Sequence, residues 1–201
     1  MVTMKRLLVG SVGLLLVAIV SGPAGAGPLE EPGFTKVLTC TACHGFGGNS
    51  QSDTMPIIAG MPHAYFKKQI ETYATGKRPS PEMEPYAKLV LQFGVDEIGQ
   101  YFANQRMAPT PIKAAADAIA RGRVAAAPCV ICHGADGKGD VAKLIPGLAG
   151  QPPGYLREQM ILLKQDQRNP GDAALIAAKA LMKSIQDATF ADLAAYYSSL
   201  R

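Results

Sequence analysis

The chain has 201 residues, 48% of them hydrophobic and 18% charged, and its formal net charge is +4. So small an excess of basic residues does not support a nucleic-acid-binding function, which a strongly basic surface would indicate. There are 4 cysteines, 3 histidines and no tryptophan. Chemistry that needs cysteine or histidine is therefore confined to very few positions.

The N-terminus is typical of a secretory signal peptide. Lys5 and Arg6 precede an apolar run over 7–20, and small residues follow up to Ala26. The run is shorter than the roughly 20 apolar residues that span a bilayer. We therefore predict that residues 1–26 are removed by cleavage after Ala26 and that the mature chain is periplasmic, with an uncleaved N-terminal anchor as the alternative.

The rest of the sequence contains an internal repeat. Residues 56–70 align without gaps on 146–160, and the same Pro, Ala, Gly, Pro, Tyr and Gln coincide. Upstream, the segment that begins at Cys40 recurs from Cys129. A duplication explains this pattern better than chance does.

The repeat predicts two domains, residues 27–108 and 109–201, joined by a proline-containing linker over 107–112. Downstream of the first match, residues 96–105 answer residues 189–198. Each domain is short of apolar core for its size, so a bound group would have to supply part of that core.

Helical spacing of apolar residues dominates both halves, and no stretch alternates over strand length. The sequence therefore predicts an all-α protein. In chain order, the predicted helices are 34–38, 64–75, 96–105, 113–127, 154–166, 173–185 and a last helix whose buried stripe is Phe190, Leu193, Ala194 and Tyr197.

Both halves contain the pattern Cys-x-x-Cys-His, at residues 40–44 and 129–133, and these two pentads hold every cysteine of the chain. The pattern is typical of c-type haem attachment, in which both cysteines form thioethers and the histidine binds iron. It predicts two covalently bound haem c groups, on Cys40 and Cys43 with His44, and on Cys129 and Cys132 with His133.

Zinc, disulfides and a thioredoxin-like redox motif are the competing interpretations of the cysteine pairs. A four-thiolate zinc site would make no use of a histidine after each pair. The redox motif requires a strand before its first cysteine, whereas helices are predicted here. An exported chain with two matched pentads favours haem over all three.

The sequence resembles the cytochrome c4 family over essentially the whole mature chain. The resemblance rests on His-Gly after each cysteine pair, on Ile58-Ala59-Gly60 and Leu148-Ala149-Gly150 before a Tyr-x-x-x-Gln helix, and on the tyrosine-bearing last helix of each half. It implies two tandem class I cytochrome c domains related by a pseudo-twofold axis, with haem propionates near the interface. It also implies a soluble or loosely membrane-associated electron carrier that acts towards a terminal oxidase.

In that family, a methionine before the last helix of each domain is the second axial ligand. Met83, 18 positions before Tyr101, matches this place in the first half. Its thioether would raise the haem potential. A loop methionine that fills a gap in the core is the plainer alternative.

The second half departs from the family at this position. With Tyr101 matched to Tyr196, the counterpart of Met83 is Ala178, which cannot bind iron. We expect Met182, one turn further on, to complete the second haem. Ligation by Lys179 or Lys183, and a five-coordinate iron, are the alternatives that the sequence leaves open.

Other polar residues carry weaker signals. His63 is expected at the surface rather than on a metal. Tyr65 and Tyr155 are either hydrogen-bonding groups near a haem or buried rings with a polar tip. A basic group forms either a docking patch or an ordinary solvated face; its members are Lys67, Lys68, Lys77 and Arg78.

No second chemical constellation appears, so the sequence favours an electron carrier over an enzyme. Expected partners are a quinol-oxidising complex or dehydrogenase as donor and a terminal oxidase as acceptor. The chief alternative is the dihaem subunit of a flavocytochrome c sulfide dehydrogenase-like enzyme. A thiosulfate dehydrogenase would need a spare cysteine as haem ligand, and a peroxidase would need an open iron at the second haem.

Overall fold

The structure is a computed structural model that describes residues 27–201, so the predicted signal peptide lies outside the described residues. Within this range the regular elements are nine α-helices and three short 3₁₀ segments, without a strand. The helices are α1 Phe34–His44, α2 His63–Ala74, α3 Met83–Phe93, α4 Val95–Asn104, α5 Ala116–Ala125, α6 Val130–His133, α7 Pro153–Lys164, α8 Ile176–Ser184 and α9 Asp187–Ser199. The predicted all-α class is confirmed, and none of these helices is long and apolar enough to cross a membrane.

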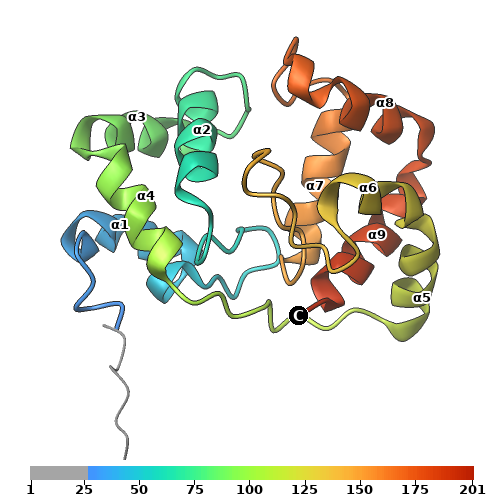
Figure 1. The fold of residues 1–201 in the computed structure, drawn as a ribbon, viewed down its shortest axis with the longest axis horizontal. Coiled ribbons are helices and arrows are strands. Elements are labelled where there is room, and N and C mark those ends of the chain that lie inside the picture. Colours follow the sequence, from blue (N-terminus) through green and yellow to red (C-terminus); the bar gives the residue numbers. More distant parts are fainter. Residues whose placement is uncertain (1–26) are drawn as a thin grey trace, which may run out of the picture.

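The helices form two groups that lie side by side, α1 to α4 and α5 to α9 (Figure 1). The segment between α4 and α5 passes from one group to the other without helical structure and contains the predicted linker. Thr110 in this segment donates its backbone N–H to Gly150 O at 2.8 Å, which ties it to the second group. The exact boundary at residues 108 and 109 stays a prediction.

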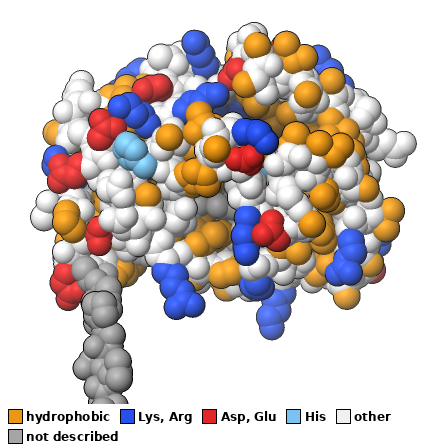
Figure 2. Space-filling view, in the orientation of Figure 1, with side chains coloured by type: hydrophobic (Ala, Val, Ile, Leu, Met, Phe, Trp, Pro, Cys, Tyr) orange, Lys and Arg blue, Asp and Glu red, His pale blue; other side chains and the backbone are white. Residues whose placement is uncertain are grey.

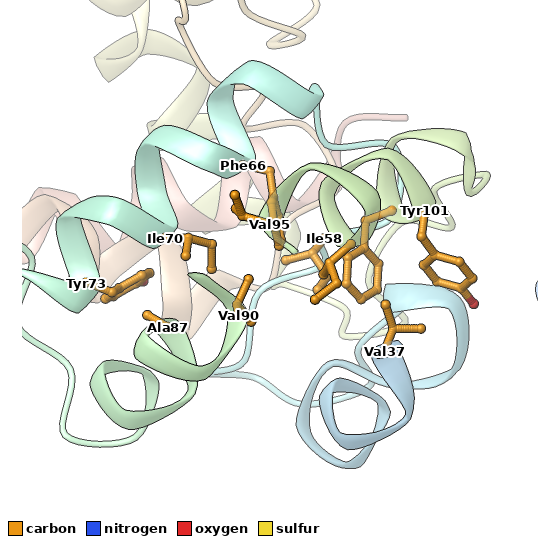
Figure 3. Packing of buried hydrophobic residues seen from close by; sticks show 11 residues of the cluster. Val37, Ile58, Phe66, Ile70, Tyr73, Ala87, Val90, Val95 and Tyr101 are labelled. Carbon is orange, nitrogen blue, oxygen red and sulfur yellow. The ribbon is translucent and has the colours of Figure 1, made fainter. Parts of the chain in front are cut away.

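The first half has a core of its own, built from one face of each helix (Figure 3). Val37 of α1 and Tyr101 of α4 lie at one end of it, and Tyr73 of α2 and Ala87 of α3 lie at the other. Phe66 and Phe102 pack with ring centroids 5.8 Å apart. The buried residues of each helix recur at intervals of three and four positions, so that one face of each helix packs into this core.

The second half repeats this plan around the crossing of α5 and α9. Phe190 and Leu193 are fully buried there, together with Ala194 and Tyr197. The predicted stripe of the last helix is thus confirmed. Gly122 lies where α5 meets α9, and a Cβ at this glycine would be 1.9 Å from Asp192 O. The two helix backbones can approach this closely only because residue 122 has no side chain.

Helix α3 and the full length of α1 were not predicted. Ala87 and Val90 are the only buried residues of α3, while Tyr86, Leu89, Leu91 and Phe93 are exposed. The helical period is nevertheless present, because Met83, Tyr86, Ala87 and Val90 fall at i, i+3, i+4 and i+7, but we expected a loop before the last helix there. Helix α1 continues through residues 40–44 because nothing in the pentad breaks it, and Gly45, at φ 74°, ends it.

The predicted alignment of the two closing helices is wrong by two residues. Gly60 donates to Phe102 O at 2.8 Å, and Gly150 donates to Tyr197 O at 2.9 Å. Likewise Gly33 lies against Tyr101, and Gly122 lies against Tyr196. These contacts pair residues 96–105 with 191–200 rather than with 189–198, in agreement with the match of the two tyrosines.

Gly122→Ala should destabilise the second half by about 1–3 kcal/mol, because the added methyl must push α5 off the backbone of α9. Urea unfolding followed by circular dichroism measures this free energy. Ala120→Ser, on the exposed side of the same helix, is the matched control and should change stability by less than about 0.5 kcal/mol. Equal stabilities of the two variants would contradict the close crossing.

Candidate functional site: two haem-attachment segments

Each cysteine pair lies on one turn of helix. Cys40 and Cys43 belong to α1, whereas Cys129 ends a 3₁₀ turn and Cys132 lies in α6. Side chains three residues apart project from the same side of a helix, so each pair can reach two points on one flat molecule. None of these four cysteines forms a disulfide, and Cys43 and Cys132 are exposed. Burial raises the pKa of the Cys40 and Cys129 thiols.

The two pentad histidines are held in the same way. His44 Nδ1 lies 2.9 Å from Pro56 O, and His133 Nδ1 lies 2.9 Å from Pro146 O. A carbonyl only accepts, so Nδ1 carries the proton and Nε2 is left with a lone pair for a metal. Burial also lowers the pKa of both rings, despite the carbonyl contact. Both histidines are therefore neutral imidazoles of fixed orientation, the form that binds iron.

The zinc and disulfide interpretations find no support in this geometry. No group of three or more Cys, His, Asp or Glu side chains comes together as a metal site within residues 27–201. The two cysteine pairs belong to different halves, and neither pair is bridged. A metal at either histidine would therefore have to arrive within a larger bound group.

A cavity of about 460 Å³ opens beside Cys40, Cys43 and His44. Its walls come chiefly from apolar side chains of α2, α3 and α4, among them Phe66, Ile70, Tyr73, Met83, Val90 and Phe102. The volume lies within the range of cofactor sites, roughly 300–1,000 Å³. An apolar, planar macrocycle bound through two thioethers fits the chemistry of this cavity.

Met83 lies where a second ligand to such a group would be needed. It is the first residue of α3, its side chain borders the cavity, and its backbone N–H donates to Ser80 Oγ at 3.1 Å. The methionine thus begins a helix rather than standing in an open loop. Its side chain is only partly buried against the first core, which leaves the sulfur accessible from the cavity.

The residues around the second histidine differ. Met182 is 7% exposed and belongs to the second core, where Leu156, Phe190 and Leu193 also lie. Lys179 is buried too, and its Nζ contacts Asp166 Oδ1 and Asn169 O, both at 2.6 Å. Lys183 is exposed. That Met182 binds iron stays a prediction.

The two halves meet at a pair of arginines, of which the sequence pointed only to Arg78, as a member of a basic surface group. Arg78 donates to Tyr155 Oη at 2.8 Å and to Gln159 Oε1 at 2.7 Å in the other half. Arg168 donates in return to Tyr65 Oη at 3.2 Å and to Gln69 Oε1 at 3.3 Å. The two arginines, the two tyrosines and the two glutamines of this network are each 90 positions apart in the sequence. This spacing of the repeat alone could have identified the arginines.

The predicted grouping of Arg78 with the surface lysines is wrong, since Arg78 is 2% exposed. Lys67 pairs with Asp96 at the surface, and the same carboxylate lies 3.2 Å from His63. His63 is thus partly exposed, as expected, and lies apart from both pentads. Figure 2 shows blue basic side chains scattered over the visible face rather than gathered in one patch.

Further hydrogen bonds hold the halves in register at this boundary. Gln151 accepts from Ile57 N at 3.0 Å and donates to Ile57 O at 2.7 Å. Asp53 accepts from the backbone N–H of Gly154 at 2.8 Å and of Tyr155 at 2.9 Å. The first cavity is lined partly by α7 of the second half, so the boundary also shapes the site.

Arg78 tests whether haem fits this cavity. The side chains that accept from this buried cation, Gln69, Tyr155 and Gln159, are neutral, and its Nε has no partner among the described residues. Burial alone would raise the pKa of Tyr155, but the charges of Arg78 and Arg168 outweigh it and lower that pKa. A buried cation requires an anion, and haem brings propionates. The cavity therefore fits a haem whose carboxylates reach Arg78.

Comparisons with known proteins agree with this site. The sequence profile of the cytochrome c family matches residues 119–201. Cytochrome c4 from Pseudomonas aeruginosa is 33% identical over 90% of this chain and 94% of its own. The thiosulfate dehydrogenase electron acceptor from Thiomonas intermedia is 28% identical over 90% of this chain and 85% of its own. The solved structure of reduced cytochrome c4 from Pseudomonas stutzeri superposes with a TM-score of 0.73 at 24% identity, covering 83% of this chain and 96% of that one.

The repeated helical fold and the two pentads define a dihaem c-type cytochrome, an electron carrier with two covalently bound haem c groups. Within that class, the chain belongs to the cytochrome c4 family. The predicted fold of two tandem class I cytochrome c domains is confirmed by the same comparisons.

Arg78→Met should lower the reduction potential of one haem by an amount on the order of 50–100 mV, since a unit charge about 10 Å from iron contributes this much at an effective dielectric constant of about 20. Losing a nearby cation favours the ferric state. Potentiometric titration of the holoprotein measures the shift. Arg123→Met, which removes an exposed arginine of α5, is the control and should leave both potentials unchanged.

Proposed function

We propose that Cys40 and Cys43 bind the first haem as thioethers, with His44 and Met83 as its axial ligands. Cys129 and Cys132 bind the second haem in the same way, with His133 on one side of the iron. The observation that carries this assignment is the matched pair of histidine contacts to Pro56 O and Pro146 O. Each leaves an Nε2 lone pair beside a cysteine pair on one helical turn.

Each bound haem supplies an iron that takes up or releases one electron. The chain keeps this process reversible. The proline carbonyls hold the histidine rings in one orientation, so little reorganisation accompanies a change of charge. The apolar wall around the first cavity excludes water, and the Met83 sulfur favours the ferrous state relative to a nitrogen ligand.

The boundary between the halves supports electron exchange between the two haems. Arg78 and Arg168 face each other's tyrosine and glutamine partners across it. Propionates of both haems would find their counter-ions there, which brings the haem edges towards the same surface. An electron that enters through one half can then leave through the other.

The carrier works in the periplasm, between a quinol-oxidising complex as donor and a terminal oxidase as acceptor. The cleavable N-terminal segment predicted at residues 1–26 supports export, and thioether attachment of haem to an exported chain is consistent with it. Peripheral association with the membrane would place the carrier near both partners.

A second candidate role is that of electron acceptor for a dehydrogenase. The named function of the Thiomonas intermedia relative, which aligns over 90% of this chain, favours it. A subunit role in a flavocytochrome c sulfide dehydrogenase-like enzyme has weaker support, because the matching sulfide dehydrogenase cytochrome aligns over only 45% of this chain.

Stopped-flow spectroscopy separates these roles. The reduced holoprotein is mixed with membranes that contain a terminal oxidase, and the oxidised holoprotein is mixed with thiosulfate and a purified thiosulfate dehydrogenase. The carrier role predicts fast oxidation by the membranes and slow reduction by the dehydrogenase. The opposite ranking of rates would overturn it.

Replacing Cys40 and Cys43 together by alanine should remove the first haem and unfold the first half, because that haem forms part of its core. Mass spectrometry counts the remaining haem, and circular dichroism follows melting. Gln92→Ala, at an exposed position of α3, is the control that should keep both haems. A double variant that keeps full helicity and a cooperative melt would contradict this dependence.

Met83→His should keep the first haem low-spin and lower its potential by an amount on the order of 0.1–0.3 V, within the roughly 0.8 V range that axial ligands span. A second imidazole stabilises ferric iron more than a thioether does. Met61→His, at a residue that borders the same cavity, is the control. An unchanged potential together with a persistent sulfur-to-iron absorption band would show that Met83 is not the ligand.

A further inference from the structure

The position opposite His133 is where the two halves differ most. The counterpart of Met83 can be located from two sides of the repeat. The closing helices pair Phe102 with Tyr197, since Gly60 and Gly150 donate to these carbonyls. Counted back from that match, the residue at the place of Met83 is Ala178.

A second way to match the halves, counting forward from Arg78 and Arg168, also places an alanine at the position of Met83. Arg78 and Arg168 make equivalent contacts across the boundary, and Met83 lies five positions after the first of them. Five positions after Arg168 is Ala173. The methyl group of an alanine cannot bind iron, so neither way of matching the halves provides a ligand.

Met182 takes the place of a core residue. In the register of the closing helices its counterpart is Ala87, which is 0% exposed, belongs to the first core and does not border the first cavity. Met182 is likewise buried in the second core. A long, flexible side chain at this buried position fills core volume, which is a packing role.

Neither lysine of α8, Lys179 or Lys183, is suited to bind the iron. Lys179 has its Nζ between a carboxylate oxygen of Asp166 and the carbonyl of Asn169. Both contacts use N–H donors of Nζ and direct it away from other partners, and a lysine must lose its proton before it can bind iron. Lys183 is exposed.

Met160 is the remaining thioether in this region. It lies 90 positions after Ile70, which borders the first cavity, and it packs against the second core. In the first half, Ile70 and Met83 both border the cavity, and only Met83 is the proposed ligand. By this match Met160 corresponds to a residue of the cavity wall. An experiment must still test Met160 as an alternative ligand.

We propose that the iron bound at His133 has no sixth ligand from the chain and binds an uncharged diatomic gas, of which carbon monoxide is the probe. This inference rests on the proposed attachment of the second haem to Cys129 and Cys132. Cys129 belongs to the second core together with Leu156, Phe190 and Leu193, and such apolar surroundings of the attachment segment favour a small neutral ligand over an anion.

Titration of the ferrous holoprotein with carbon monoxide tests the proposal. The expected result is one bound molecule per chain, with a Soret shift in half of the haem absorbance, while the haem ligated by Met83 does not react. Ala178→Met should abolish this binding and add a second sulfur-to-iron absorption band in the ferric protein. Ala180→Met, at an exposed position of the same helix, is the matched control and should bind the gas as the wild type does.

Two further variants distinguish an open iron from a rival ligand. Met160→Leu and Met182→Leu keep the apolar volume, and both should bind carbon monoxide to the same extent as the wild type. A wild-type protein that binds no gas overturns the proposal, and so does a leucine variant that binds more than the wild type.

A haem count keeps the two hypotheses apart. Mass spectrometry that finds two haems, together with no gas binding, contradicts only the open site. Two haems that persist after Cys129→Ala is combined with Cys132→Ala contradict the attachment itself. Because the wild-type titration needs no variant, a failure of Ala178→Met to fold leaves the test intact.

Discussion

The structure depends on one hydrogen bond that occurs once in each half, from a histidine Nδ1 to a proline carbonyl. It sets the tautomer, points Nε2 away from the chain and fixes the imidazole beside the cysteine pair. The glycine that ends each pentad helix, Gly45 or Gly134, turns the chain sharply enough for the proline segment to return to the ring. Helix, turn and loop are thus arranged around the orientation of one side chain.

The second constraint is the pair of arginines between the halves, of which Arg78 is buried and Arg168 is partly buried. A guanidinium among neutral partners is costly unless an anion approaches it. Arg78 and Arg168 therefore make the boundary depend on the bound haems, and the haem sites depend on the boundary, since α7 lines the first cavity. Association of the halves and cofactor binding stabilise each other, although each half has its own core.

The duplicated halves have diverged at the segment before the closing helix. Helix α3 begins with Met83 and presents it to a cavity, whereas α8 buries Met182 and Lys179 and presents alanines. On the ligand assignment proposed above, the same framework would hold one iron with two protein ligands and another with one. This difference would separate a haem dedicated to electron transfer from a haem that can also bind a ligand.

The sequence by itself determined the fold class, the duplication and the haem-attachment residues, because helical periodicity and the Cys-x-x-Cys-His pattern are local. We did not predict α3, although Met83, Ala87 and Val90 follow helical spacing, and we misplaced Arg78 among surface cations. Only the tertiary structure decided the register of the closing helices, the proline partners of the histidines and the crossing of arginines between the halves. Each of these depends on residues far apart in the chain that meet when the two cores pack, and no local pattern encodes such a meeting.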